Sequence, residues 1–136
     1  MTPRLLALLP LAALAASCAP TDPAARAEAD AARVPAAKVI GEGQSCINRD
    51  QVRQTLVRSA NVIDFEMQSG KVYRNTLRQR CPGLLLDRAI TYETSISQLC
   101  TQQIVYALQT IGGTPQRGAA CSLGAFVPVE YVEKGK

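Results

Sequence analysis

Five cysteines, one of them set apart from the other four, constrain the fold of this chain more than any other feature. Cys18 ends an apolar leader, whereas Cys46, Cys81, Cys100 and Cys121 are spread through the remaining residues. An even number of well-spaced cysteines in a short chain is typical of disulfide bonds formed in an oxidising compartment. We therefore expect a small domain that two disulfide bonds support.

Residues 1–17 have the pattern of a signal peptide. One positive charge, at Arg4, precedes an apolar stretch over 5–16, and small residues stand directly before Cys18. Crossing a bilayer takes about 20 apolar residues, so this stretch is too short for a transmembrane anchor. The pattern predicts that the leader is removed.

Cys18 is predicted to be a lipid attachment point, because the residues before it resemble a bacterial lipobox. The lipobox prefers leucine three residues before the cysteine, where this chain has Ala15, with Leu14 one position earlier. The alternative is simple cleavage near Ala16 or Ala19, which leaves one unpaired cysteine or none. An unpaired exposed thiol is reactive in an oxidising space, which favours lipidation. The resemblance implies a Gram-negative cell envelope, and the residue after the cysteine predicts an outer-membrane lipoprotein that faces the periplasm.

Residues 18–45 are predicted to be a lipid-anchored flexible linker, followed by a β-rich domain over 46–136. The linker is rich in alanine and proline, carries mixed charge and lacks apolar periodicity. Alanine propensity would allow a helix over 23–33, with Pro23 acceptable in its first turn. Such a helix has no apolar face, so we expect it to fray.

The domain is predicted to be mostly β. Residues 61–67 alternate apolar and polar side chains, the pattern resumes over 71–77, and the loop between them ends in Gly70. This arrangement is typical of a hairpin whose three-residue loop ends in a left-handed glycine. Weaker strand patterns cover 52–58, 89–95, 102–108 and 123–131. Residues 52–58 could equally begin as a short helix, and Pro128 indicates an edge or a bulge in the last strand. The composition of 112–115 predicts a flexible loop. The fold class is therefore a small five- or six-stranded antiparallel barrel or sandwich, supported by disulfides and preceded by signal peptide and linker.

The hairpin has a register that a structure can check. A three-residue loop places Phe65 opposite Tyr73 and Asp64 opposite Arg74. The aromatic pair would face the core and the ionic pair would face solvent, where an ion pair contributes little to stability.

Four cysteines permit three disulfide pairings, and spacing alone does not choose between them. Topology favours one of the three. Cys81 and Cys100 bracket the strand predicted over 89–95, so a bond between them would close that segment. Cys46 and Cys121 would then join the start of the domain to its last strand.

Five segments of the domain carry a resemblance to a known family. They are 62–67 (VIDFEM), 70–77 (GKVYRNTL), 80–84 (RCPGL), 99–100 (LC) and 117–126 (RGAACSLGAF). Together they resemble a family of small proteobacterial envelope proteins, a domain of unknown function. The resemblance covers about residues 46–132. It implies secretion and paired cysteines, and it implies no enzymatic activity.

The residues available for chemistry favour a protein that is not an enzyme. The chain has no histidine, which removes the commonest general base and every Ser-His-Asp or Cys-His arrangement. It also lacks a Cys-x-x-Cys pair, so we expect no metal site and no cofactor. Asp64 and Glu66 fall on one face of a strand, as the carboxylates of a glycosidase could, but alternating acids on a hairpin are more often solvated surface.

Three arginines near the Cys81-Pro82-Gly83 turn form the best candidate contact for an anion. They are Arg78, Arg80 and Arg88, and residues 46–136 carry eleven basic against seven acidic side chains. The expected partners are the membrane, through the lipid at Cys18, and an anionic envelope component or a protein. Nucleic acid is excluded, since its binding needs a denser basic stripe with interleaved aromatic residues.

Three classes of function follow. The first is an envelope-tethered, non-catalytic binding or structural module. The second is an inhibitor or accessory subunit of a secreted enzyme. The third is a hydrolase that uses carboxylates such as Asp64, Glu66 or Asp87.

Overall fold

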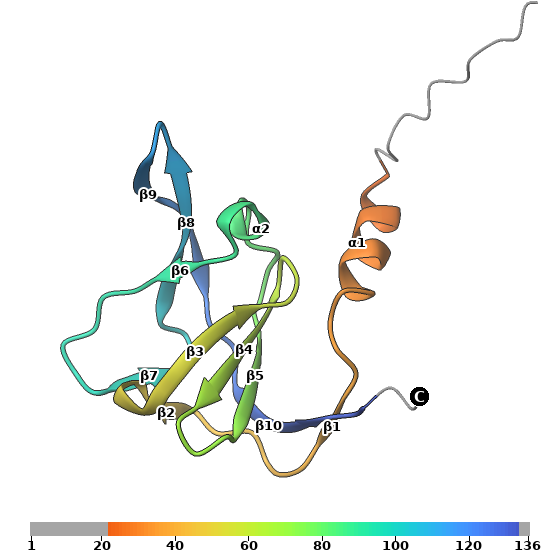
Figure 1. Cartoon of the computed structure of the whole chain (residues 1–136), viewed down its shortest axis with the longest axis vertical. Helices are drawn as coiled ribbons and strands as arrows, with labels where there is room; N and C mark the ends of the chain where they lie inside the picture. The colour runs from red at the N-terminus through yellow and green to blue at the C-terminus, as the bar shows by residue number, and fades with distance from the viewer. Residues whose placement is uncertain (1–21, 134–136) are drawn as a thin grey trace, which may run out of the picture.

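The structure is a computed structural model that describes residues 22–133. The predicted signal peptide and Cys18 lie outside the described residues. Helices and strands follow one another along the chain as shown in Figure 1. They are α1 (Pro23–Ala31), β1 (Ala37–Val39), β2 (Cys46–Asn48), the 3-10 turn η1 (Arg49–Gln51), β3 (Val52–Val57), β4 (Val62–Met67), β5 (Val72–Thr76), α2 (Leu84–Asp87), β6 (Ile90–Thr91), β7 (Gln98–Cys100), β8 (Ile104–Ile111), β9 (Thr114–Ser122) and β10 (Phe126–Tyr131). Within 22–133 neither helix has the length and apolar character needed to cross a bilayer.

The strands form antiparallel sheets of five, two and three strands. Their orders are β1-β10-β5-β4-β3, β2-β7 and β6-β8-β9. The prediction of a mostly β, antiparallel and disulfide-supported fold is therefore confirmed. The prediction left a barrel or a sandwich of five or six strands open, and a closed barrel is not formed, because each sheet ends in strands that have only one neighbour in residues 22–133.

The core packs against one face of the five-stranded sheet, the face that carries Phe65 and Phe126, which we call the inner face. Phe65 of β4 and Phe126 of β10 are both fully buried and meet edge to face, with ring centroids 5.5 Å apart. Burying such a side chain contributes about 1.5–3 kcal/mol. Strands far apart in sequence are thus held together by aromatic packing at the centre of the sheet.

The β4–β5 hairpin has the predicted register. Phe65 lies opposite Tyr73 and Asp64 lies opposite Arg74. Gly70 has a φ of +85°, in the left-handed region that a glycine adopts without steric cost. The alternating pattern and the glycine were sufficient here because both strands lie next to each other in sequence.

The β8–β9 hairpin was not predicted. Residues 112–115, expected to be a flexible loop, instead contain a two-residue turn at Gly112 and Gly113, both with positive φ. A two-residue turn in which both residues have positive φ matches the twist of the two antiparallel strands that it joins. The hairpin projects from the body of the molecule, and its tip is the uppermost point of the β-rich part in Figure 1.

Pro128 lies inside β10, which pairs with both β1 and β5 in regular register, so it is at neither the edge nor the bulge that was predicted. Its carbonyl accepts a hydrogen bond from the Ile40 N–H at 3.0 Å. The N–H and C=O of one residue in an antiparallel strand point to the same side. The side of Pro128 on which proline lacks an N–H is therefore the side that faces the end of β1, away from β5. The ladder between β10 and β5 is therefore not interrupted.

Part of the predicted linker belongs to the domain. Strand β1 pairs with β10, and Gln44 exchanges backbone hydrogen bonds with Phe126 at 2.8 and 2.9 Å. The boundary predicted at residue 46 is thus too late. Helix α1, which was expected to fray, is formed over Pro23–Ala31 because Asp30 is buried against the domain. Pro23 lies in its first turn, as expected, and the Asp22 side chain accepts from the Ala24 N–H at 2.9 Å.

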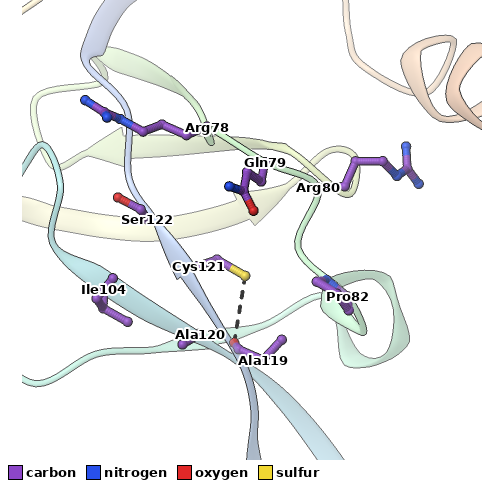
Figure 2. Close-up of a pocket in the computed structure, with 9 residues that line it drawn as sticks. All are labelled: Arg78, Gln79, Arg80, Pro82, Ile104, Ala119, Ala120, Cys121 and Ser122. Atoms are coloured by element: carbon purple, nitrogen blue, oxygen red, sulfur yellow. Dashed lines mark hydrogen bonds between the residues drawn. The ribbon is translucent and has the colours of Figure 1, made fainter.

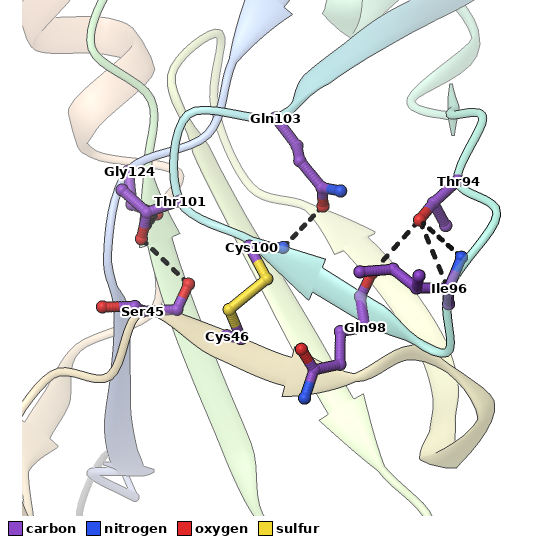
Figure 3. The surroundings of a disulfide bond; sticks show 9 residues. All are labelled: Ser45, Cys46, Thr94, Ile96, Gln98, Cys100, Thr101, Gln103 and Gly124. Carbon is purple, nitrogen blue, oxygen red and sulfur yellow. Dashed lines mark hydrogen bonds between the residues drawn. A yellow bond between two sulfur atoms is a disulfide. The ribbon is translucent and has the colours of Figure 1, made fainter.

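The predicted disulfide pairing is wrong. Cys46 bonds Cys100, directly across the β2–β7 pair, and Cys81 bonds Cys121, which joins the segment after β5 to β9. Figure 3 shows the first of these bonds between its two strands. The error follows from β7 and β9, two strands that the sequence pattern did not reveal. Each bond contributes roughly 2–4 kcal/mol to stability.

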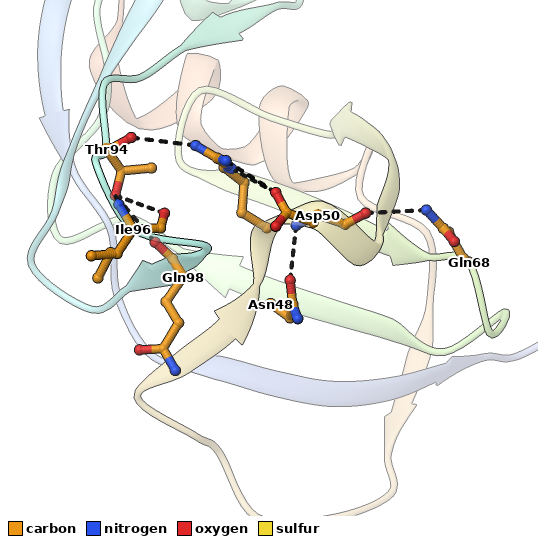
Figure 4. A network of polar contacts seen from close by, with 7 residues as sticks. Asn48, Asp50, Gln68, Thr94, Ile96 and Gln98 are labelled. Carbon is orange, nitrogen blue, oxygen red and sulfur yellow. Dashed lines mark hydrogen bonds and ion pairs between the residues drawn. The ribbon is translucent and has the colours of Figure 1, made fainter.

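Polar contacts hold η1 against two loops, as Figure 4 shows. The Asn48 side chain accepts from the Asp50 N–H at 2.9 Å, and Arg49 pairs with Asp50 at 3.0 Å. Arg49 also donates to the Thr94 carbonyl at 3.3 Å, and Gln68 donates to the Asp50 carbonyl at 3.1 Å. These contacts connect η1 to the loop before β7 and to the β4–β5 turn.

Candidate functional site: a groove around Arg80

Three neighbouring hollows meet at Arg80. The first, of about 450 Å³, lies between residues 78–82 and the end of β9, with Ile104 of β8 on its wall. The second, of about 270 Å³, lies beside α2, and the third, of about 250 Å³, lies against α1. Arg80 lines all three, so we call them together the Arg80 groove.

Basic side chains dominate the groove. Arg78 and Arg80 line the first hollow, and Arg26 and Arg33 of α1 line the third. Asp30 is the one acidic residue among the lining residues of all three hollows. Four cations against one anion leave a positive potential that attracts anions.

Two of the three predicted arginines come together and the third does not. Arg78 and Arg80 share the first hollow, whereas Arg88 ends α2 with a φ of +50° and lines none of the three. Arg26 and Arg33 were not predicted, because residues 18–45 were expected to be a linker. The only sequence signal for them is the pair of cations seven residues apart on the same helical segment.

The arginines are spread along the groove and do not form a clamp. In Figure 2 the side chains of Arg78 and Arg80 extend in opposite directions, with Gln79 between them. Within residues 22–133, Arg78 makes no ion pair, whereas Arg80 pairs with Asp30 at 3.0 Å. Such spacing suits an extended anion better than a single compact one.

Apolar side chains share the groove with the arginines. Ile104 in the first hollow is 45% exposed, and Leu86 in the second is 70% exposed. Contact between these apolar side chains and water is unfavourable, and a ligand that covers them with its own apolar groups would gain binding free energy. The groove can therefore contact both charged and apolar parts of one ligand.

Asp30 attaches α1 to the wall of the groove. Its side chain is nearly buried, and its Oδ2 accepts from the Ala60 N–H at 2.9 Å and pairs with Arg80. Its Oδ1 is also buried and has no hydrogen-bond partner among the described residues. Asp30 is the one buried residue of α1, so the helix is attached to the domain chiefly through one oxygen of the Asp30 carboxylate.

A second cluster of charges surrounds Asp64, on the outer face of the five-stranded sheet. Asp64 is fully buried and accepts from Arg74 at 2.8 and 3.0 Å, from Arg58 at 3.0 Å and from the Tyr131 hydroxyl at 2.9 Å. Arg58 also donates to Tyr131 at 2.8 Å and lies over its ring. The predicted solvent-facing ion pair is therefore wrong, because Tyr131 and Arg58 cover this carboxylate.

The same contacts keep Asp64 ionised. Burial raises the pKa of its carboxyl, but hydrogen bonds from Arg74, Tyr131 and Arg58 outweigh burial, and the net pKa is lowered. Burial also raises the pKa of the Tyr131 hydroxyl, which therefore remains a donor at neutral pH.

The other carboxylates considered for chemistry are engaged or lie apart. Glu66 accepts from Gln54 and pairs with Arg53, and these contacts lower its pKa. Asp87 is exposed at the end of α2. Asp64 and Glu66 thus bind different side chains and do not share one site. Among residues 22–133, no group of three or more acidic or cysteine side chains is placed to hold a metal ion.

Comparison of the chain with protein-family models, with curated proteins and with solved structures gives no match. The resemblance to small proteobacterial envelope proteins stays a prediction from the quoted segments.

Proposed function

We propose that this protein is a non-catalytic binding module of the bacterial cell envelope, and that its Arg80 groove binds an anionic partner. One observation carries the proposal: four arginines line the groove against a single acid, Asp30, which is already paired. The surplus of positive charge attracts anions from solution to the groove. An anionic partner would balance that charge.

The shape of the groove favours an extended partner. Hollows on both sides of Arg80 run from the end of β9 to α1, and Arg78 and Arg80 extend in opposite directions. A chain with repeated carboxylates would contact several of the arginines at once. Cell-wall polymers, acidic polysaccharides and acidic protein segments share this chemistry.

A non-catalytic role agrees with the state of the carboxylates. Asp64 is closed off from solvent by its three hydrogen-bond partners, and Glu66 is paired with Arg53. The chain contains no histidine to serve as a general base. A hydrolase would need a carboxylate in an open cleft with a matched partner.

The envelope location is proposed from the sequence, through lipidation at Cys18 and attachment to the outer membrane. The two disulfide bonds agree with it, because such bonds persist in oxidising compartments. We expect the mature N-terminal peptide to begin at an acylated Cys18 when measured by mass spectrometry. Recovery of Cys18→Ala in the membrane fraction at the same yield as the native chain would contradict this.

Binding through the groove is tested with Arg78→Ala and a matched control, Lys38→Ala. Each change removes one exposed cation, but only Arg78 lines the groove. We expect Arg78→Ala to weaken binding of polygalacturonate about threefold to tenfold, and raised salt to weaken it further. Isothermal titration measures the affinity. Equal affinities for the two variants would argue against the groove.

A role as inhibitor or accessory subunit of a secreted enzyme is the second candidate. One observation favours it: the β8–β9 hairpin projects from the domain, and Ile111 beside its turn is 57% exposed. A projecting hairpin can enter the cleft of another protein. A photo-crosslinking side chain at position 111 would then label one secreted enzyme in intact cells, whereas the same group at position 38 would not.

A further inference from the structure

Strand β9 has a free edge beside the first hollow. It is the last strand of the sheet β6-β8-β9, so within residues 22–133 it has a neighbour only on the β8 side. Its final residues, 119–122, form one wall of the hollow, and residues 78–82 form the other. Figure 2 shows this end of β9 passing between Ile104 and the segment that carries Arg78 and Arg80.

The backbone groups of this edge alternate in direction. The Leu123 N–H donates to the Gln103 carbonyl at 3.0 Å, and its carbonyl accepts from the Gln102 N–H at 3.0 Å, so both groups point toward β8. Because directions alternate along a strand, Ser122 and Ala120 direct their N–H and C=O groups away from β8. Neither residue makes a backbone hydrogen bond on that side to any residue in 22–133.

Most of the β9 edge is protected against pairing, but its last three residues are not. Proteins usually block an edge strand with charged side chains, proline or a bulge. Strand β3, at an edge of the five-stranded sheet, carries Arg53 at a bulge. Strand β9 carries Pro115, Arg117 and a bulge at residues 118–119, so only the regular part that follows, Ala120 to Ser122, lacks such protection. The side chains of Ala120 and Ser122 are small, and that of Cys121 is bonded to Cys81. Small side chains let another backbone approach closely.

We propose that the partner of the Arg80 groove is an extended acidic segment of a protein, which adds as a strand to the free edge of β9. This inference rests on the proposed function and names its partner. The segment would lie about 4.8 Å from β9 and exchange backbone hydrogen bonds with Ala120 and Ser122. Its acidic side chains would reach Arg78 and Arg80, which border the hollow.

A polysaccharide satisfies only part of this arrangement. It supplies negative charge, but it has no row of alternating N–H and C=O groups at the spacing of a strand. The unpaired backbone groups of Ala120 and Ser122 therefore favour a peptide. The basic side chains beside them require that the peptide be acidic.

The test uses the full mature chain labelled with ¹⁵N and synthetic peptides of about eight residues that alternate glutamate with threonine. Two further peptides carry N-methyl groups on alternate residues, on the odd positions in one and on the even positions in the other. Only one edge of an added strand faces β9, so we expect one methylated peptide to bind at least about tenfold more weakly and the other to bind like the parent. The parent peptide should also slow hydrogen exchange of the Ala120 and Ser122 amides.

Ala120→Pro provides a second variant, because it removes an N–H that points away from β8. Its ¹⁵N spectrum shows whether the fold is intact, and we expect the parent peptide to bind it about tenfold more weakly. Equal binding of both methylated peptides, or of Ala120→Pro and the native chain, would overturn strand addition. If polygalacturonate still binds and loses affinity in Arg78→Ala, the proposed function survives that outcome. If neither probe depends on Arg78, both proposals fail.

Discussion

Two buried carboxylates, Asp64 and Asp30, show how differently a charge can be held in one small domain. Asp64 accepts four hydrogen bonds from two arginines and a tyrosine, on the face of a five-stranded sheet. Asp30 uses one oxygen for Ala60 and Arg80 and leaves the other buried without a partner. The first carboxylate connects β4 to β5, to β10 and to the residue that follows β3, and the second only attaches a helix.

The difference has an energetic meaning. A buried charge is tolerated when all its hydrogen-bonding positions are used, and an unused position costs free energy. Asp64 is therefore part of the structural framework. Asp30 is a weaker attachment, and it lies at the groove for which we propose a ligand.

The largest effect is expected for Asp64→Asn. The change leaves Arg58 and Arg74 partly buried without a counter-charge, which costs about 3 kcal/mol of unfolding free energy. Urea denaturation followed by circular dichroism measures it. A loss of less than 1 kcal/mol would mean that the cluster does not hold the strands together.

The next effect concerns acid. The folded pKa of Asp64 lies below its ordinary value of 3.8, so the unfolded chain binds the proton more readily. The stability from this group is fully present above pH 3.8 and is lost as the pH falls through the lower folded pKa. Asp64→Asn should flatten the decline of the unfolding free energy in that acidic range. An unchanged pH profile would show that Asp64 is not the responsible carboxyl.

Asp30→Ala is expected to cost about 1–2 kcal/mol, because it leaves the buried Ala60 N–H without its acceptor. The loss should be local. Hydrogen exchange should speed up in α1 and at Ala60, with little change in β4 and β5. A uniform increase across the domain would mean that α1 belongs to the same cooperative unit as the sheet.

Arg78→Ala is expected to change stability least, by no more than about 0.5 kcal/mol, because its side chain is exposed and unpaired among the described residues. Its effect should appear in binding alone. A thermal melt beside the titration with polygalacturonate separates the two. A large loss of stability would place Arg78 in the framework with Asp64.

Local patterns predicted the parts of the fold that are local. The β4–β5 hairpin, its register and the left-handed Gly70 all follow from neighbouring residues. The β8–β9 hairpin was missed because β9 is rich in small and polar residues that carry no strand pattern, although Gly112-Gly113 is a recognised turn signal. Once β9 was missed, Cys121 could not be assigned to its true neighbour.

The candidate site was predicted in part for the same reason. Arg78 and Arg80 are close in sequence and share a hollow, whereas Arg26 and Arg33 reach the groove only because Asp30 attaches α1. The burial of Asp64 depends on Tyr131, which is 67 residues away in sequence. No periodic pattern records such a contact.

The sequence alone determined the predominance of antiparallel strands, the central hairpin and the presence of cysteines for two disulfide bonds. Only the tertiary structure decided which cysteines pair, which carboxylate is buried and which arginines share a groove. The reason is physical: alternation and turn residues act over a few positions, whereas a disulfide or a buried ion pair depends on which surfaces the packed core brings together.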